Sequence, residues 1–294
     1  MHEFTVSNEL LHRPEALRAR AQEEGYLFFR SLIDAEAIWR ARLQILDLCR
    51  EAGWLQPGSN PADGIAAEGV AYVEPEPAFM EVYNRLQKLE DFHTLAHQPK
   101  LLAMFDTLFG EPTLVHARNI ARIIFPQNLK YTTPAHQDYV HIQGTEETWT
   151  AWIPLGDCPR ELGSLAILRG SHRQGGYPTQ AAYGAGGLGI DTESLPYPWV
   201  EGDFLIGDVV VFHSLCVHRA IPNLTPNRLR LSVDYRYQPL SHPVVESSFR
   251  PHHGQITWEE VYAGWHSNRY QYYWRNLPLR FAEWTPKYHQ AARR

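Results

Sequence analysis

The chain has few cysteines and no long apolar run. The first argues against a disulfide-rich protein, and the second against a membrane-spanning one. Its 294 residues include three cysteines, with no CxxC or other zinc-binding spacing: Cys49, Cys158 and Cys216. We therefore expect free thiols in a reducing compartment, the cytoplasm. The N-terminal residues lack the apolar stretch of a secretory signal, and no run approaches the ~20 apolar residues of a membrane helix. We expect no membrane partner.

Positive charge is also scarce. Lys and Arg total 27 against 33 Asp and Glu, which gives a net charge of −6. No local run of basic residues reverses this balance, so the composition argues against a nucleic-acid partner. The hydrophobic fraction of 44% and charged fraction of 20% are those of an ordinary globular protein. Without repeats or a linker, we expect one domain spanning residues 1–294.

The pattern of hydrophobic and polar residues changes along the chain. From about residue 13 to about residue 110 the sequence has mostly helical patterning. Pro14 suits the first turn of a helix there, and Gly25 suits the end of one. From about 114 to 240 come short β-branched and aromatic runs, separated by turn residues: 120–125, 148–155, 164–168, 208–213 and 229–237. Residues of about 241–294 are aromatic and expected to be helical. The predicted fold class is mainly β, a sandwich or barrel with flanking helices.

One long segment interrupts the predicted strands. Residues 174–203 are rich in Gly, Pro and Tyr and include the run YGAGGLG. Long loops inside a compact domain are usually lids or binding loops. We therefore expect this segment, together with the loop at 55–70, to form walls of a binding pocket.

A candidate metal site begins at His136 and Asp138, which form an H-x-D motif. On an extended strand these two side chains would point to the same face and could reach one ion. A second histidine arrives in GDVVVFHSLCVHRAIPN, as His213 or His218. Two imidazoles and one carboxylate on one face of a metal leave three positions open for a co-substrate and dioxygen. H-x-D alone is common, however, and its carboxylate can simply orient a histidine.

Five motifs together are more specific than H-x-D. They are HQD (136–138), WIPLGD (152–157), LRGSH (168–172), GDVVVFH (207–213, with His218) and PNLTPNRLRLSVDYRYQ (222–238). Their order resembles the phytanoyl-CoA dioxygenase family of iron(II)- and 2-oxoglutarate-dependent oxygenases. The resemblance implies a double-stranded β-helix core, a jelly roll of the cupin type, and the use of Fe(II), 2-oxoglutarate and O2. It implies His136, Asp138 and His218 as ligands, since the family places its distal histidine just before the R-x-I-P-N turn.

2-Oxoglutarate also needs a fixed cation for its distal carboxylate, and the planar fork of arginine suits that group. Arg228, Arg230 and Arg236 share one face of the predicted strand with Ser232. The triplet at 230–232 resembles the R-x-S pattern of related oxygenases, which favours Arg230 with Ser232. Arg228 stays the alternative, because the spacing from His218 is slightly longer here than in familiar members of the family. Trp152 matches a family tryptophan near 2-oxoglutarate.

The resemblance says less about the substrate. We expect a small molecule with an anionic or polar end, contacted by the following residues near the triad: Arg122, Tyr131, Thr133 and His141. Asp138 favours hydroxylation or a related oxidation, because related halogenases replace this carboxylate with Gly or Ala. Secondary metabolism is the expected setting.

Two other functions stay open at this point. One is a cupin-like metalloenzyme that uses no 2-oxo acid; the other is a non-catalytic jelly roll that binds a metal or ligand. Release of succinate would distinguish the predicted oxygenase from both. The substrate's identity and the oligomeric state also stay open.

Overall fold

In the computed structural model, which describes residues 2–184 and 186–286, the N-terminal helices begin and end at residues suited to those positions. Helix α1 (Pro14–Glu24) has Pro14 in its first turn, and Gly25 ends it in the left-handed region at φ 75°. Asp34 caps α2 (Ala35–Glu51) by accepting a hydrogen bond from the Glu36 N–H. The predictions at Pro14 and Gly25 are confirmed. Three more helices follow: α3 (Pro77–Leu86), α4 (Glu90–Thr94) and α5 (Pro99–Phe109).

Two β-sheets form the centre of the molecule. The larger sheet has the order β2-β10-β5-β12-β3, and β4 pairs with the first half of the long strand β12. The smaller sheet has the order β1-β9-β6-β11. The strands of the larger sheet are β2 (Tyr26–Phe29), β3 (Thr113–Val115), β4 (Ile120–Ile124), β5 (Trp149–Pro154), β10 (Val209–His213) and β12 (Arg230–Pro239). Those of the smaller sheet are β1 (His2–Glu3), β6 (Leu165–Leu168), β9 (Trp199–Glu201) and β11 (His218–Ala220).

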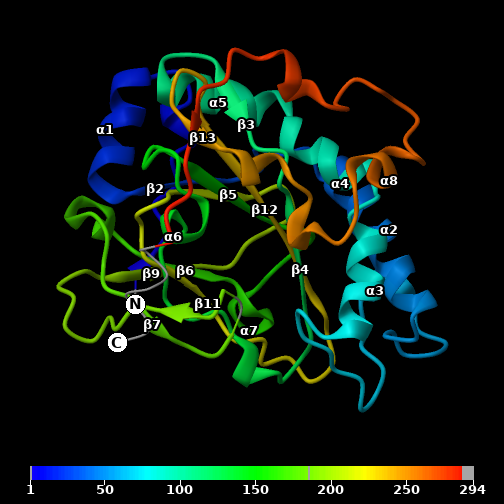
Figure 1. The fold of residues 1–294 in the computed structure, drawn as a ribbon. Coiled ribbons are helices and arrows are strands. Elements are labelled where there is room, and N and C mark those ends of the chain that lie inside the picture. Colours follow the sequence, from blue (N-terminus) through cyan, green and yellow to red (C-terminus); the bar gives the residue numbers. More distant parts are fainter. Residues whose placement is uncertain (1, 185, 287–294) are drawn as a thin grey trace.

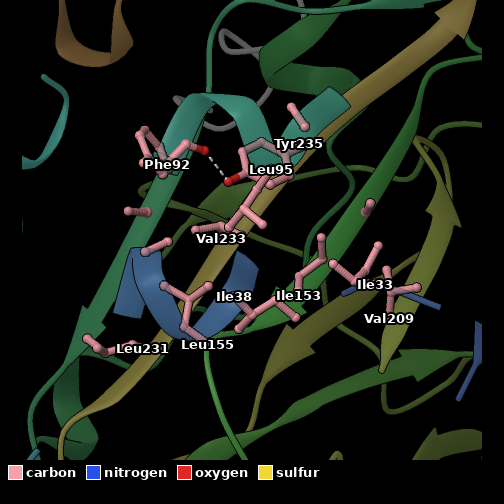
Figure 2. Close-up of a cluster of buried hydrophobic side chains, with 14 of the residues drawn as sticks. Ile33, Ile38, Phe92, Leu95, Ile153, Leu155, Val209, Leu231, Val233 and Tyr235 are labelled. Atoms are coloured by element: carbon pink, nitrogen blue, oxygen red, sulfur yellow. Dashed lines mark hydrogen bonds between the residues drawn. The ribbon is translucent and has the colours of Figure 1, made fainter. Parts of the chain in front are cut away.

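Each face of the larger sheet is covered by a different layer. Alternation along β5 turns Trp152 toward the smaller sheet, where it joins a buried cluster with Phe28 and Ile167. Ile153 points the other way and packs with the helices, and Figure 2 shows this cluster around Ile38 of α2. In Figure 1 the helical part of the chain, blue to cyan, borders the larger sheet, and β6, β9 and β11 lie at the lower left. The fold is mainly β with flanking helices, of the cupin type.

The C-terminal segment differs from the helical expectation. Its one α-helix among the described residues is α8 (Trp258–Tyr262), which begins with a capping box between Thr257 and Glu260. Gly264 lies just beyond this helix, and the aromatic side chains that follow pack onto β3 around Leu114. Two short ladders complete the strands: β7 (Gln180–Ala181) with β8 (Leu188–Gly189), and β13 (Val244–Val245) with β14 (Phe281–Ala282).

The helices of the described residues are all too short or too polar to cross a lipid bilayer. The three cysteines are free and buried, as the sequence predicts.

The packing between the larger sheet and the helices can be tested at Ile153. This side chain is fully buried between β5 and the helical layer. Ile153→Ala should lower the free energy of unfolding by about 2–5 kcal/mol, because it removes buried methyl groups and leaves a cavity. Leu205→Ala is the control, since Leu205 is 58% exposed, and should change it by about 0.5 kcal/mol or less. Equal effects in urea unfolding would contradict the assigned core.

Three buried histidines outside the triad predict acid sensitivity. Burial lowers the pKa of His93 and His116 to about 4 and that of His97 to about 3, from the usual 6.5. The unfolded chain therefore takes up protons below pH 6.5 that the folded chain does not. The contribution of these three neutral histidines to the free energy of unfolding is fully present above pH 6.5 and is lost as the pH falls toward 4.

Lowering the pH from 7.5 to 5.5 should therefore reduce the free energy of unfolding by on the order of 1 kcal/mol for each of these histidines. Urea unfolding of the metal-free protein at the two pH values measures this. A free energy of unfolding that stays level between them would show that the three imidazoles are not buried as described.

Candidate metal and co-substrate site

Two histidines meet across an isolated β-bridge between segments far apart in the sequence. His136 and His218 exchange backbone hydrogen bonds, each N–H donating to the other residue's carbonyl at 3.0 Å. His218 begins β11, which pairs with β6 in the smaller sheet. Their ring centroids lie 4.2 Å apart. The smaller sheet therefore positions both imidazoles.

Asp138 reaches the same point by a route that differs from the extended strand expected for H-x-D. Its backbone is in the right-handed helical region (φ −64°, ψ −31°), directly before the short helix α6 (Tyr139–Ile142). The extended stretch ends at the bridge of His136, and the chain then turns. The two side chains still converge, because the turn carries the carboxylate back toward the imidazole.

Both imidazoles turn their Nε2 atom toward the carboxylate of Asp138. His136 Nδ1 donates to the Pro134 carbonyl at 2.8 Å, and His218 Nδ1 donates to the Cys216 carbonyl at 3.0 Å. A neutral ring that donates from Nδ1 has a free lone pair on Nε2. The Nε2 atoms of His136 and His218 lie 3.6 and 3.7 Å from Asp138 Oδ1. Three ligand atoms therefore face one another.

The second oxygen of Asp138 is held by the larger sheet. Its Oδ2 accepts a hydrogen bond from Thr150 Oγ1 of β5 at 2.5 Å and lies 3.5 Å from Arg236 Nη2 of β12. Burial opposes ionisation, but the nearby charge of Arg236 helps to hold the pKa of Asp138 well below its usual value. Burial also lowers the pKa of His218 to about 3, so this ring is neutral near pH 7.

These residues fit a divalent transition metal. Two neutral imidazoles and a carboxylate are the donor set of non-haem iron(II) oxygenases, which keep coordination positions open. The carbonyl partners of the Nδ1 atoms supply the outer hydrogen bonds that such ligands need.

A second group of possible ligands fits a metal less well. Glu74, His252 and His253 also place ligand atoms close together. Glu74, however, pairs with Arg122 at 3.2 Å and with His253 at 2.7 Å, and His252 Nδ1 shares a hydrogen bond with the Tyr83 hydroxyl at 2.7 Å. The ligand atoms of this second group are therefore already used in hydrogen bonds and ion pairs within the protein. The ligand atoms of the triad face one another instead.

His213 lies in a different part of the molecule from the triad. It ends β10, and its Nδ1 accepts a hydrogen bond from the Leu215 N–H at 3.1 Å. Its ring lies against Trp149, and its Nε2 is 3.6 Å from Glu147. The turn at 214–217 separates His213 from His218, so the two are not on one continuous strand.

Arg230 lies in a small cavity beside the triad. This inner cavity is bordered by His136, Asp138 and His218 together with Thr150, Trp152, Arg230 and others. Arg230 is 4% exposed, and its Nη1 donates to Ser232 Oγ at 2.6 Å. Its Nε has no hydrogen-bond partner, and no carboxylate of the described residues forms an ion pair with it. An unpaired guanidinium in a buried cavity fits an anionic ligand.

The other candidates of the sequence are placed differently around this cavity. Trp152 borders it, and the Arg230 guanidinium lies 5.9 Å from its ring. Arg228 precedes β12, is partly exposed and does not line the cavity. Arg236 does line it, but next to Asp138.

A larger cavity adjoins the inner one at His136, Asp138 and Arg236. This outer cavity is bordered by Arg122, Thr133 and His141, among others. Arg122 is already paired with Glu74 and Asp234, each at 3.2 Å, so its charge is neutralised. Tyr131 lies apart, in a smaller cavity that it shares with Arg122 and Thr133. The structure thus brings three of the four substrate candidates to the outer cavity.

The predicted pocket walls are borne out for one loop only. Gly186, in the segment 174–203, borders the outer cavity. The hairpin of this segment packs closely on the loop before His136, since a Cβ at Gly184 (φ 120°) would lie 2.6 Å from the Thr132 carbonyl. The loop at 55–70 borders neither cavity.

Two residues of the site are absent from the sequence-based candidates. Thr150, which binds Asp138, could have been found by alternation, because it shares a strand face with Trp152. Arg118, which borders the outer cavity, lies in the connection between β3 and β4 and belongs to no motif.

Comparison with known proteins agrees with this geometry. The model of the family described as phytanoyl-CoA dioxygenase (PhyH) matches residues 21–231. A 1-deoxypentalenic acid 11-beta-hydroxylase of Streptomyces arenae is 30% identical over 258 residues, covering 81% of this chain and 86% of its own. The peroxisomal phytanoyl-CoA dioxygenase of Rattus norvegicus is 24% identical over 232 residues, covering 76% and 67%.

The fold has relatives among solved structures. The epimerase SnoN, solved in complex with Fe3+, alpha-ketoglutarate and nogalamycin RO, superposes with a TM-score of 0.55 at 21% identity, covering 79% of this chain and 86% of that one. The family match and the hydroxylase relative lead to one conclusion: the chain belongs to the phytanoyl-CoA dioxygenase family and is a 2-oxoglutarate-dependent dioxygenase that uses Fe(II) and O2.

Proposed function

We propose that this protein hydroxylates an unactivated C–H bond of a small molecule, with iron(II) held by His136, Asp138 and His218. In the same turnover, one oxygen atom of O2 enters the new hydroxyl group and the other enters succinate, which forms as 2-oxoglutarate loses CO2. The observation that supports these assignments best is the convergence of two Nε2 atoms on Asp138 Oδ1, beside a cavity with an unpaired arginine.

The chain's own residues have distinct tasks in this proposal. Bound iron(II) supplies the activation of dioxygen and the oxidising power that breaks the C–H bond. Arg230 and Ser232 bind the distal carboxylate of 2-oxoglutarate, and Trp152 borders the space for its carbon chain. Thr150 and Arg236 hold Asp138 Oδ2, so that Oδ1 is the oxygen turned toward the metal.

The outer cavity is the proposed substrate site. It borders His136 and Asp138, so a bound molecule would lie next to the metal. The Streptomyces relatives are named for hydroxylation of 1-deoxypentalenic acid, which supports a substrate from secondary metabolism. Three buried free cysteines support a reducing compartment, which we take to be the cytoplasm.

The position of 2-oxoglutarate is tested by two arginines close in sequence. Arg230→Gln should weaken 2-oxoglutarate binding roughly 100-fold, because it removes the charged partner of a buried carboxylate. Arg228→Gln, the matched control, should bind it like the wild type, since Arg228 lies outside the cavity. The weak visible band of an anaerobic iron(II)–2-oxoglutarate chelate measures both affinities. If Arg228→Gln is the impaired variant, Arg228 is the anchor; if neither is, the co-substrate binds elsewhere.

The metal assignment is tested at Asp138. Asp138→Ala should reduce both iron retained after anaerobic dialysis and succinate formed to the level of a metal-free sample, because one of three ligands is lost. Asp191→Ala controls for the change in net charge, since Asp191 is exposed in the segment 174–203. Full iron content and full succinate formation in Asp138→Ala would remove this residue from the site. Activity that persists without any 2-oxo acid would instead indicate a cupin-like enzyme of another kind.

A further inference from the structure

Arg118 is the one arginine of the outer cavity without a protein partner among the described residues. The other two are paired: Arg122 with Glu74 and Asp234, and Arg236 with Asp138. Arg118 forms no side-chain hydrogen bond or ion pair within residues 2–184 and 186–286. Its backbone is nevertheless held in place, because its N–H donates to the Ser248 carbonyl at 2.9 Å. The backbone of Arg118 is therefore fixed, and its guanidinium has no partner within these residues.

The guanidinium of Arg118 lies near another cation. Burial, and then the nearby charge of Arg236, lower the pKa of Arg118. Arg118 is only partly buried, whereas Arg230 in the inner cavity is almost fully buried. A cation that borders a cavity and lacks a carboxylate partner there is a suitable site for an anionic group of a ligand.

Other groups that face this space do not supply a competing charge. His116 and His252 border the outer cavity, and burial keeps both neutral by lowering the pKa of His116 to about 4 and that of His252 well below its usual value. His253 is engaged with Glu74 at 2.7 Å. Among the described arginines that border this cavity, Arg118 is the one whose charge has no carboxylate partner.

Arg118 also borders a groove that leads outward. This surface groove is lined by Arg118 and His141 on its inner side and by Arg250, Glu246, Phe281 and Glu283, among others, farther out. Arg250 and Glu246 pair with each other at 3.0 Å, and neither glutamate pairs with Arg118. A molecule that enters by this groove would meet Arg118 before it reaches the triad.

We propose that Arg118 binds the carboxylate of the substrate, which is therefore a small organic acid whose carbon skeleton extends from Arg118 toward His136 and Asp138. A single planar guanidinium matches one carboxylate, which it can bind through two parallel hydrogen bonds. A coenzyme A thioester, with several phosphate charges, would need more free cations than this cavity offers. This inference rests on the proposed substrate site, and it adds the chemical group by which the substrate is recognised.

The experiment compares acids with their primary amides, which have similar shape but no charge. The probes are cyclohexanecarboxylate, adamantanecarboxylate and abietate, each beside its amide, added to protein loaded anaerobically with iron(II) and 2-oxoglutarate. In calorimetric titrations, at least one acid should bind the wild type roughly 10-fold or more tightly than its amide. Arg118→Gln should abolish this difference, and Arg118→Lys should keep part of it.

Arg250→Gln is the matched control, because it removes an arginine of the same groove that is already paired, and it should retain the preference for the acid. Arg118→Gln should also keep the wild-type affinity for 2-oxoglutarate and the wild-type melting temperature, which excludes a general defect. The inference is overturned if no acid binds the wild type better than its amide, or if Arg118→Gln keeps the preference. A wild type that fails to bind 2-oxoglutarate contradicts the proposed function instead, and the acid–amide comparison on metal-free protein still decides the role of Arg118.

Discussion

The backbone bridge between His136 and His218 is the contact on which the rest of the site depends. It joins the turn of the H-x-D motif to β11, and β11 is fixed by its pairing with β6 in the smaller sheet. Asp138, in contrast, is held through its second oxygen by residues of β5 and β12 in the larger sheet. The three ligand atoms therefore converge where the two sheets come together, and each sheet supplies part of their orientation. Packing that holds the sheets face to face also holds the triad.

Charge in the two cavities is distributed so that few groups are free to bind a ligand. Arg122 is neutralised by Glu74 and Asp234, and Arg236 supports Asp138. His116 and His218 are kept neutral by burial, each with a pKa of about 4 or lower. Within the described part of the chain, each cavity has one guanidinium without a carboxylate partner, Arg230 in the inner one and Arg118 in the outer one. The triad lies between two positions that suit a carboxylate, one for the co-substrate and one for the proposed acid.

The sequence predicted those parts of the site that follow from short-range geometry. Arg230 and Ser232 are two residues apart on β12, so strand alternation alone places them together, and the structure joins them by a hydrogen bond. The choice of His218 over His213 required the family's motif order, because both histidines lie near the end of a predicted strand. The conformation of Asp138 was predicted wrongly, since α6 has only four residues and gives no helical periodicity to detect. The C-terminal segment was predicted to be more helical than it is. The spacing of its aromatic residues is compatible with a helix, but also with the turns that the structure contains there.

Features that depend on long-range assembly could not be read from the sequence. The outer cavity combines residues from the helical region, the β-core and the C-terminal segment, such as Glu74, Arg118 and His252. Whether an arginine is free or paired depends on which carboxylates the fold brings to it, and Arg122 and Arg118 differ in this respect although they are four residues apart. Their roles therefore became distinguishable only in the structure.

The most direct test of this account is a crystal structure of the anaerobic complex with iron(II) and 2-oxoglutarate, with anomalous scattering recorded at the iron edge. The account predicts one strong iron peak between His136, Asp138 and His218, with the distal carboxylate of 2-oxoglutarate on Arg230. An iron peak at Glu74, His252 and His253 instead, or a co-substrate whose distal carboxylate lies on Arg118, would contradict it.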